Sequence, residues 1–232
     1  MVIFNINQMK PTLLLFFFLF ALSSCEIDNY ESPELTISGE ILDAETNELV
    51  ESGGINAGTI VKLYEGNSIQ PLIYNTLPEG TFINSKVFPG NYLLEAEGPF
   101  TMVEEGLQNL VIDSDEEIEI KVIPHVRLTI NIEEQSGVTA KIKLSYEKVL
   151  PEQKLLDLGI VWSEYRNPNI YSFPEGSILQ EDVSTLDLTT GEKSFILENL
   201  KSNTTYYVRG SARTANTGNY YNYSTQLILQ TQ

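Results

Sequence analysis

The sequence has only one cysteine, Cys25, and one histidine, His125, in its 232 residues. A single cysteine cannot form an intramolecular disulfide, so buried apolar side chains must hold the fold together. With one histidine and one cysteine, the sequence also excludes histidine-based nucleophilic triads and metal sites built from several cysteines and histidines. There is also no P-loop and no glycine-rich turn between a strand and a helix. We therefore predict no catalytic residue, no metal site and no cofactor.

Basic residues are scarce, with 14 Lys and Arg against 32 Asp and Glu, and a formal net charge of −18. Residues 26–123 hold 20 acidic and 3 basic residues, whereas residues 124–232 hold 12 and 10. This asymmetry predicts two domains with different surfaces. It excludes nucleic acid as a partner, because phosphates need basic neutralisation. A ligand on the acidic half should be a neutral glycan, or an anionic glycan bridged by Ca²⁺.

No stretch keeps an apolar period of 3.6 residues for three helical turns. Short alternating runs broken by turn residues predict strands instead. They lie at residues 35–41, 59–64, 91–96, 117–122, 126–132, 139–146 and 158–163. The fold class is therefore all-β, with two tandem β-sandwich domains at 35–123 and 124–232. Ile123-Pro124-His125 marks the boundary, and His125 is expected to be a linker side chain.

The one long apolar run lies near the N-terminus, at residues 13–22, after the positive charge of Lys10. It is too short to span a bilayer, which takes about 20 residues, and indicates a signal peptide at residues 1–24. Leu22-Ser23-Ser24-Cys25 resembles the lipobox of bacterial lipoproteins. That resemblance implies that the Cys25 thiol receives diacylglycerol and anchors the chain in a lipid bilayer, with residues 25–34 as an acidic tether. The alternative is an ordinary secretory cleavage site that leaves a free thiol.

Four segments of the first half follow a recognisable pattern. They are Ile37-Ser38-Gly39-Glu40-Ile41, Asp43-Ala44-Glu45-Thr46-Asn47, Glu79-Gly80-Thr81-Phe82 and Phe88-Pro89-Gly90-Asn91-Tyr92. The pattern resembles carboxypeptidase-regulatory or prealbumin-like sandwiches, which implies a carbohydrate-binding-like fold for residues 35–123. Gly80 and Gly90 are expected to supply backbone freedom at tight turns. Asn47 replaces the usual glycine and also tolerates a positive φ.

The second half contains Gly159-Ile160-Val161-Trp162-Ser163 and, later, residues 200–209. Both stretches resemble fibronectin type III-like repeats of bacterial surface proteins. By that resemblance, Tyr206 is the tyrosine-corner residue whose hydroxyl bonds back to the backbone across the turn before its strand. Trp162 is expected in the core.

Acidic residues also occur in adjacent sets: Glu104-Glu105, Asp115-Glu116-Glu117, Glu133-Glu134 and Glu181-Asp182. Glycosidases need two carboxylates that face each other across a cleft, so we interpret these sets as solvated turns. A pair that is distant in sequence remains an alternative. Asp113-Ser114-Asp115-Glu116 offers oxygen ligands for Ca²⁺, but it lacks the EF-hand spacing.

The aromatic residues are the strongest candidates for ligand contact. Tyr220, Tyr221 and Tyr223 cluster after Thr217-Gly218-Asn219, and Tyr165 and Tyr171 flank a polar loop. Sugars dock their apolar faces on exposed aromatic rings while amides and carboxylates bond the hydroxyls. The alternative, favoured for the 220–223 cluster, is packing against the first domain.

The combination of anchor and two sandwiches resembles an uncharacterised family of outer-membrane surface lipoproteins from polysaccharide-utilisation loci. That resemblance implies a non-enzymatic accessory that binds or presents polysaccharide or oligosaccharide. It also implies two partners: a TonB-dependent transporter and its glycan-binding lipoprotein. The acidic residues after Cys25 resemble surface-export signals. The alternative is a structural spacer or adhesion module that binds another protein; an enzyme ranks third.

The lipobox gives a direct prediction. Replacing Cys25 with Ser removes the thiol that would carry the lipid, so the protein should leave the detergent-soluble membrane fraction. Labelling with a radioactive fatty acid checks this, because wild type should take up label and the variant should not. Wild type that carries no label and partitions as the variant does would contradict the lipoprotein interpretation.

Overall fold

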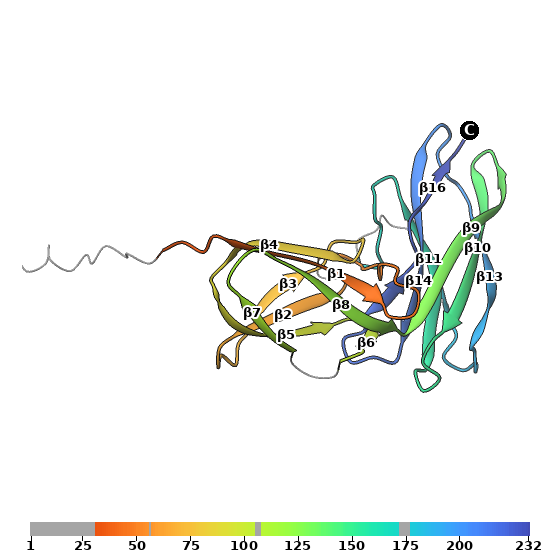
Figure 1. The fold of residues 1–232 in the computed structure, drawn as a ribbon. Helices are drawn as coiled ribbons and strands as arrows, with labels where there is room; N and C mark the ends of the chain where they lie inside the picture. The colour runs from red at the N-terminus through yellow and green to blue at the C-terminus, as the bar shows by residue number, and fades with distance from the viewer. Residues whose placement is uncertain (1–30, 56, 105–107, 172–176) are drawn as a thin grey trace, which may run out of the picture. The chain divides into compact units, whose positions relative to one another are not determined.

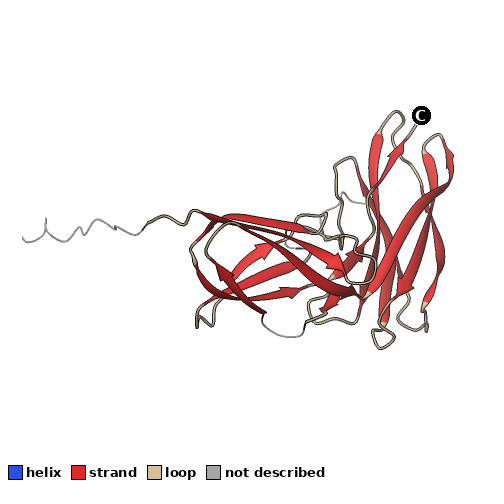
Figure 2. Ribbon diagram, in the orientation of Figure 1, coloured by secondary structure: helices blue, strands red, loops and turns tan. Residues whose placement is uncertain are grey.

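The structure is a computed structural model that describes residues 31–55, 57–104, 108–171 and 177–232. The predicted signal peptide, Cys25 and tether residues 26–30 lie outside the described residues. Pro33–Gln232 form one compact unit. Every regular element drawn in that part is a strand (Figure 2). Within it, no helix has the length and apolarity needed to cross a membrane.

The first half folds into two four-stranded sheets, ordered β4-β1-β8-β6 and β3-β2-β5-β7 (Figure 1). Strands β1 and β8 pair in parallel, while the other pairs of these sheets are antiparallel. The strands are β1 (Leu35–Asp43), β2 (Ile60–Glu65), β3 (Leu72–Asn75), β4 (Thr81–Val87), β5 (Gly90–Glu97), β6 (Phe100–Met102), β7 (Gln108–Ile112) and β8 (Glu116–Pro124).

Side chains alternate between the two faces of each strand, so the side chains of one face of each sheet form a single core. Phe82 and Tyr92 are 3% and 2% exposed there. Gly80 has a φ of +85°, and a Cβ at this position would lie 2.4 Å from the Val50 carbonyl oxygen. Asn47 has a φ of 61°, as expected. Gly90 does not need this freedom, because it begins β5 without a positive φ.

The second half also forms two sheets, ordered β13-β10-β9 and β12-β11-β14-β15, with β16 paired to β14. Its strands are β9 (Val126–Ser136), β10 (Thr139–Lys148), β11 (Leu155–Ser163), β12 (Ile178–Asp182), β13 (Thr190–Leu197), β14 (Thr205–Thr214), β15 (Tyr221–Tyr223) and β16 (Leu227–Gln230). The four sheets confirm the all-β class and are consistent with two β-sandwich domains.

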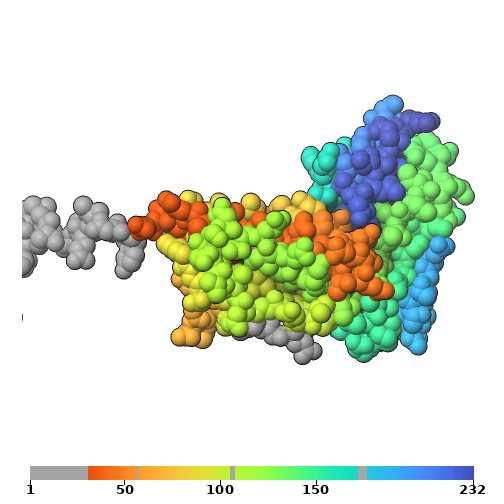
Figure 3. Space-filling model, viewed as in Figure 1, coloured from red at the N-terminus to blue at the C-terminus, as the bar shows by residue number. Residues whose placement is uncertain are grey.

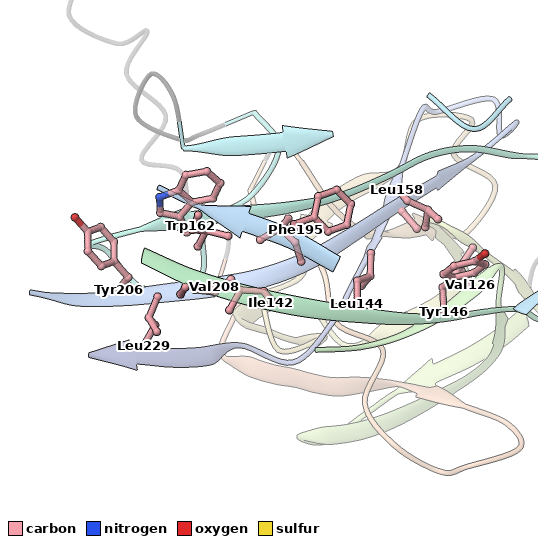
Figure 4. Packing of buried hydrophobic residues seen from close by; sticks show 14 of the residues in the cluster. Val126, Ile142, Leu144, Tyr146, Leu158, Trp162, Phe195, Tyr206, Val208 and Leu229 are labelled. Carbon is pink, nitrogen blue, oxygen red and sulfur yellow. The ribbon is translucent and has the colours of Figure 1, made fainter. Parts of the chain in front are cut away.

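The core of the second half lies between these two sheets (Figure 4). Trp162 is 6% exposed and belongs to this core, as predicted. Tyr206 is also buried, and its hydroxyl accepts a hydrogen bond from the Lys201 backbone N–H at 2.9 Å. The predicted bond from Tyr206 back to the backbone before its strand is therefore confirmed.

His125 is not the linker side chain that the sequence suggested. Strand β8 ends at Pro124 and β9 begins at Val126, so one residue separates them. The imidazole is 4% exposed, and its Nδ1 shares a 2.9 Å hydrogen bond with Thr214 Oγ1. The connection is short, and burial of its side chain fixes it to the second half.

The Tyr206 contact predicts a measurable loss of stability. Tyr206→Phe leaves the Lys201 N–H without its acceptor, and should lower the free energy of unfolding by about 1–2 kcal/mol. Urea unfolding of the chain from residue 26 on measures this change. Tyr165→Phe, which alters a tyrosine 79% exposed, is the matched control. A loss below about 0.3 kcal/mol for Tyr206→Phe would contradict the assignment.

Candidate functional site

The tyrosines that follow β14 have different surroundings. Gly218 makes room for Tyr220, because a Cβ on Gly218 would lie 2.0 Å from the Tyr220 ring. Asn216 holds the turn by accepting from the Tyr220 N–H at 2.8 Å and donating to its carbonyl at 2.9 Å. Burial raises the pKa of the Tyr220 hydroxyl, and Glu97 of β5 raises it further. Tyr220 therefore faces the first half of the chain.

Tyr223 packs beneath a fully buried arginine. The Arg209 guanidinium lies 4.5 Å from the centroid of the Tyr223 ring, a cation–π distance. Arg209 is 0% exposed and Tyr223 is 5% exposed. The Tyr223 hydroxyl accepts from the Ile170 N–H at 3.0 Å. Tyr223 is therefore a packing residue at the contact between the two halves.

Arg209 makes three hydrogen bonds, two of which connect it to the first half. Its Nε donates to the Ser224 carbonyl at 3.1 Å. Its Nη1 donates to the Ser52 carbonyl and its Nη2 to Glu51 Oε2, both at 2.9 Å. Burial lowers the pKa of Arg209, and Glu51 opposes that shift. Burial also raises the pKa of Glu51, and the positive charge of Arg209 lowers that pKa again and so offsets part of the shift.

Polar contacts around this pair extend the connection. Asn222 donates to the Pro99 carbonyl at 3.0 Å and accepts from the Val126 N–H at 3.1 Å. Asn169 donates to the Gly53 carbonyl at 2.9 Å. Each contact is buried, so each supports a fixed arrangement of the backbone on both sides. We call the contacts of Arg209, Asn222 and Asn169 with the first half the junction.

Arg127 of β9 adds a charged contact at the edge of the junction. Its Nε and Nη2 donate to the two carboxylate oxygens of Asp43 at 2.6 and 3.1 Å, and Nη2 also reaches Glu45 at 2.6 Å. Burial alone would raise the pKa of Asp43. The hydrogen bonds from Arg127 and from the Glu45 N–H outweigh it and hold that pKa below its usual range. Glu45 belongs to the loop after β1, and Figure 3 shows that loop (orange) against β9 and β10 (green).

Tyr221 and Tyr171 form an aromatic pair that reaches the surface. Their ring centroids are 6.1 Å apart and the rings are nearly perpendicular, at 87°. Tyr221 is 7% exposed, whereas Tyr171 is 58% exposed. The Tyr171 hydroxyl donates to the Asn219 carbonyl at 3.1 Å, so this exposed ring is held at both its edge and its tip. Packing by Tyr221 and the hydrogen bond to Asn219 thus fix the orientation of the exposed Tyr171 ring.

Polar side chains surround this pair. Arg213 Nε and Nη2 bind Asp157 Oδ2 at 2.7 and 2.5 Å, and Arg213 Nη1 donates to Asn219 Oδ1 at 2.9 Å. Gln180 donates to the Tyr221 hydroxyl at 2.9 Å. These groups, with Tyr171 and Tyr221, supply a ring face, amides, a carboxylate and a guanidinium within one small area. We call the six residues Tyr171, Tyr221, Asp157, Gln180, Arg213 and Asn219 the aromatic corner.

The five sequence candidates therefore do not form one site. The structure brings Tyr171 and Tyr221 together at the aromatic corner and places Tyr220 and Tyr223 in packing positions. Tyr165 stands apart in the loop after β11, 79% exposed, with its N–H bonded to Ser163 Oγ at 3.0 Å. Sequence reasoning missed the polar members of the corner. The pairing of β11 with β12 and β14 brings Asp157, Gln180 and Arg213 together. Asn219 lies in the turn between β14 and β15 and is held there by Arg213.

The acidic sets expected in turns also need correction. Glu133-Glu134 lies in β9 and Glu181-Asp182 in β12. Ser114 donates to both Asp113 and Glu116 at 3.3 Å, so the candidate Ca²⁺ segment forms bonds within itself. Among the residues that the structure describes, no group of three or more His, Cys, Asp or Glu side chains is arranged to hold a metal ion.

No protein-family model and no curated protein matches the sequence. Solved structures do match. A "putative carbohydrate binding protein" from Bacteroides uniformis is 21% identical, with a TM-score of 0.73 over 85% of this chain and 99% of its own. A DUF3823 family protein from the same species is 19% identical, with a TM-score of 0.74 over 86% and 100%. A DUF3823 family protein from Parabacteroides merdae is 16% identical, with a TM-score of 0.68 over 86% and 100%. At these identities the likeness establishes the shared fold.

Proposed function

We propose that this protein is a non-enzymatic glycan-binding lipoprotein, and that the aromatic corner contacts the sugar. The observation that carries the proposal is the Tyr171 ring, which is 58% exposed yet fixed by Tyr221 and Asn219. A fixed ring loses little conformational entropy when a sugar stacks on it. The amides of Gln180 and Asn219 lie within reach to bond sugar hydroxyls.

The carboxylates near the corner favour binding over hydrolysis. A glycoside hydrolase needs one carboxyl group whose raised pKa keeps it protonated as the acid. Asp157 is bound by two nitrogens of Arg213. Asp182 lies opposite Asp157 in the register of β12 with β11. Hydrogen bonds from the Ser184 side chain and backbone lower the pKa of Asp182. Both groups therefore suit a role as hydrogen-bond acceptors.

The shared fold supports the same proposal. The Bacteroides protein with that fold is itself described as a "putative carbohydrate binding protein". We further infer a carbohydrate-binding-like sandwich at residues 35–123 and a fibronectin type III-like sandwich at 124–232. The strand orders and the Tyr206 hydroxyl contact support this division.

The cellular setting follows from the sequence resemblance. The proposal places the protein at the outer membrane, anchored through acylated Cys25 and exposed at the cell surface. There it would hold glycan for a TonB-dependent transporter and its glycan-binding lipoprotein.

A structural spacer is the second candidate function, and the junction favours it. Buried contacts from Arg209, Asn222 and Asn169 hold the two halves in one arrangement. A rigid pair of sandwiches could set the distance between the membrane and a bound protein. A spacer needs no sugar contact, so glycan binding separates the two functions.

Tyr171→Ala tests the aromatic corner. Removing the exposed ring should weaken glycan binding by about five- to thirtyfold, because stacking on one ring contributes on the order of 1–2 kcal/mol. The melting temperature should fall only modestly, because Tyr171 is 58% exposed and its buried contacts among the described residues are limited to Tyr221 and the Asn219 carbonyl. A glycan array identifies the ligand for the chain from residue 26 on, and isothermal titration calorimetry then compares the variants.

Tyr165→Ala is the matched control, since it also removes an exposed loop tyrosine, and it should bind as wild type does. Equal losses for the two variants would contradict a specific role of the corner. Wild type that binds no glycan would favour the spacer.

A further inference from the structure

We propose a second ligand site, a groove of about 460 Å³ between the loop after β1 and the sheet of β9, β10 and β13. Its ligand class is an uncharged, hydroxyl-rich saccharide. This inference rests on the proposed glycan-binding function and extends it to a site that the sequence did not indicate. We call it the junction groove.

The size and place of the groove suit a small ligand. Binding cavities for small molecules commonly measure about 300–1,000 Å³ and lie preferentially where two domains meet. Figure 3 shows the loop that forms one wall (orange) against β9 and β10 of the floor (green). The wall and the floor come from different halves of the chain, and Arg127 bound to Asp43 fixes their separation.

The floor is a row of polar side chains on paired strands. Thr129 of β9 lies opposite Ser145 of β10, and Ser145 lies opposite Glu192 of β13. In the next row, Arg127 lies opposite Glu147, and Glu147 lies opposite Thr190. Each of the two rows therefore carries both hydroxyl and carboxylate oxygens. They provide acceptors at the spacing of neighbouring strands, about 5 Å.

The wall adds an apolar contact. Leu49 is 39% exposed and lines the groove beside Thr46 and Glu48. An apolar side chain opposite a row of acceptors matches a sugar ring, which has C–H groups on its faces and hydroxyls around its edge.

Charge decides which saccharides fit. Among the described residues that line the groove, the carboxylates are Asp43, Glu48, Glu51, Glu147 and Glu192, and the one cation is Arg127. Arg127 is already occupied by Asp43, Glu45 and Glu147. Glu51 is bound by Arg209 at 2.9 Å and Glu192 by Lys143 at 3.2 Å, so the cations beside the groove are also occupied. An acidic sugar would have to compete with these carboxylates for the cations, and would be repelled. A neutral sugar can instead donate its hydroxyl protons to those carboxylates.

Thr129→Trp blocks the floor and tests the groove directly. Asn131→Trp is the matched control, because Asn131 lies two residues along the same strand and face but outside the groove. Glu147→Gln with Glu192→Gln is a second test that removes two charged acceptors without adding bulk. Glu198→Gln, at an exposed site outside the groove, is its control.

The probes are short neutral oligosaccharides of glucose, xylose, mannose or arabinose, with oligogalacturonate as the acidic comparison. For the neutral probe that binds best, calorimetry should resolve two sites in wild type, and the affinity of one of them should fall at least about tenfold in Thr129→Trp and in the Glu147/Glu192 variant. Both controls should stay within about twofold of wild type.

Three outcomes would overturn the inference. If Tyr171→Ala loses binding while both groove variants bind as wild type does, the groove is not a sugar site and the proposed function stands. If oligogalacturonate binds more tightly than every neutral probe, the charge argument is wrong. If wild type binds no probe, the proposed function itself fails, and the groove proposal fails with it.

Discussion

The buried guanidinium of Arg209 is the interaction on which the rest of the structure depends. It is 0% exposed, and its hydrogen bonds reach Ser52 and Glu51 in the first half and Ser224 in its own half. Removing one member of such a buried pair leaves the other charge without compensation, at a cost of roughly 3–5 kcal/mol. The geometry around Arg209 is therefore strongly constrained, and the aromatic side chains nearby share that constraint.

The constraint passes from Arg209 to the surface through three tyrosine rings. Arg209 lies over Tyr223, Tyr223 packs against Tyr221 at 6.4 Å, and Tyr221 meets Tyr171 at 6.1 Å. The junction also explains part of the charge asymmetry. Arginines of the less acidic half, Arg127 and Arg209, bind carboxylates of the strongly acidic half. The excess negative charge of the first half thus serves partly to hold the second.

Local pattern predicted the fold well and the site poorly. Alternation located β1, β2, β5, β8, β9, β10 and β11, and Trp162 was correctly expected in the core. The resemblance gave the Tyr206 contact. These features depend on near neighbours in sequence. Arg209 could not be predicted in this way. Alternation along β14 points the Arg209 side chain away from the core of its own sandwich, so the ordinary expectation is that it is exposed to solvent. It is buried because Ser52, 157 residues away in sequence, lies over it. The junction groove likewise depends on a distant contact, the one between Arg127 and Asp43, 84 residues apart in sequence. The expectation that His125 is a linker side chain was wrong because its hydrogen-bond partner, Thr214, lies 89 residues further along the chain, where local pattern cannot reveal it.

Hydrogen exchange during urea unfolding of Arg209→Met tests most directly whether this one contact joins the two halves. Arg166→Met is the control, because Arg166 also lies over a tyrosine, Tyr207 at 5.5 Å, on the surface of its own sandwich. Arg209→Met should lose about 3–5 kcal/mol of stability, with residues 49–53 and β15 exchanging first. The loss should be larger at about pH 8 than at about pH 5. Burial raises the pKa of Glu51 above its unfolded value, so the folded variant loses stability as the pH rises through that raised pKa. A loss no greater than that of Arg166→Met, with unchanged exchange at residues 49–53, would contradict the account.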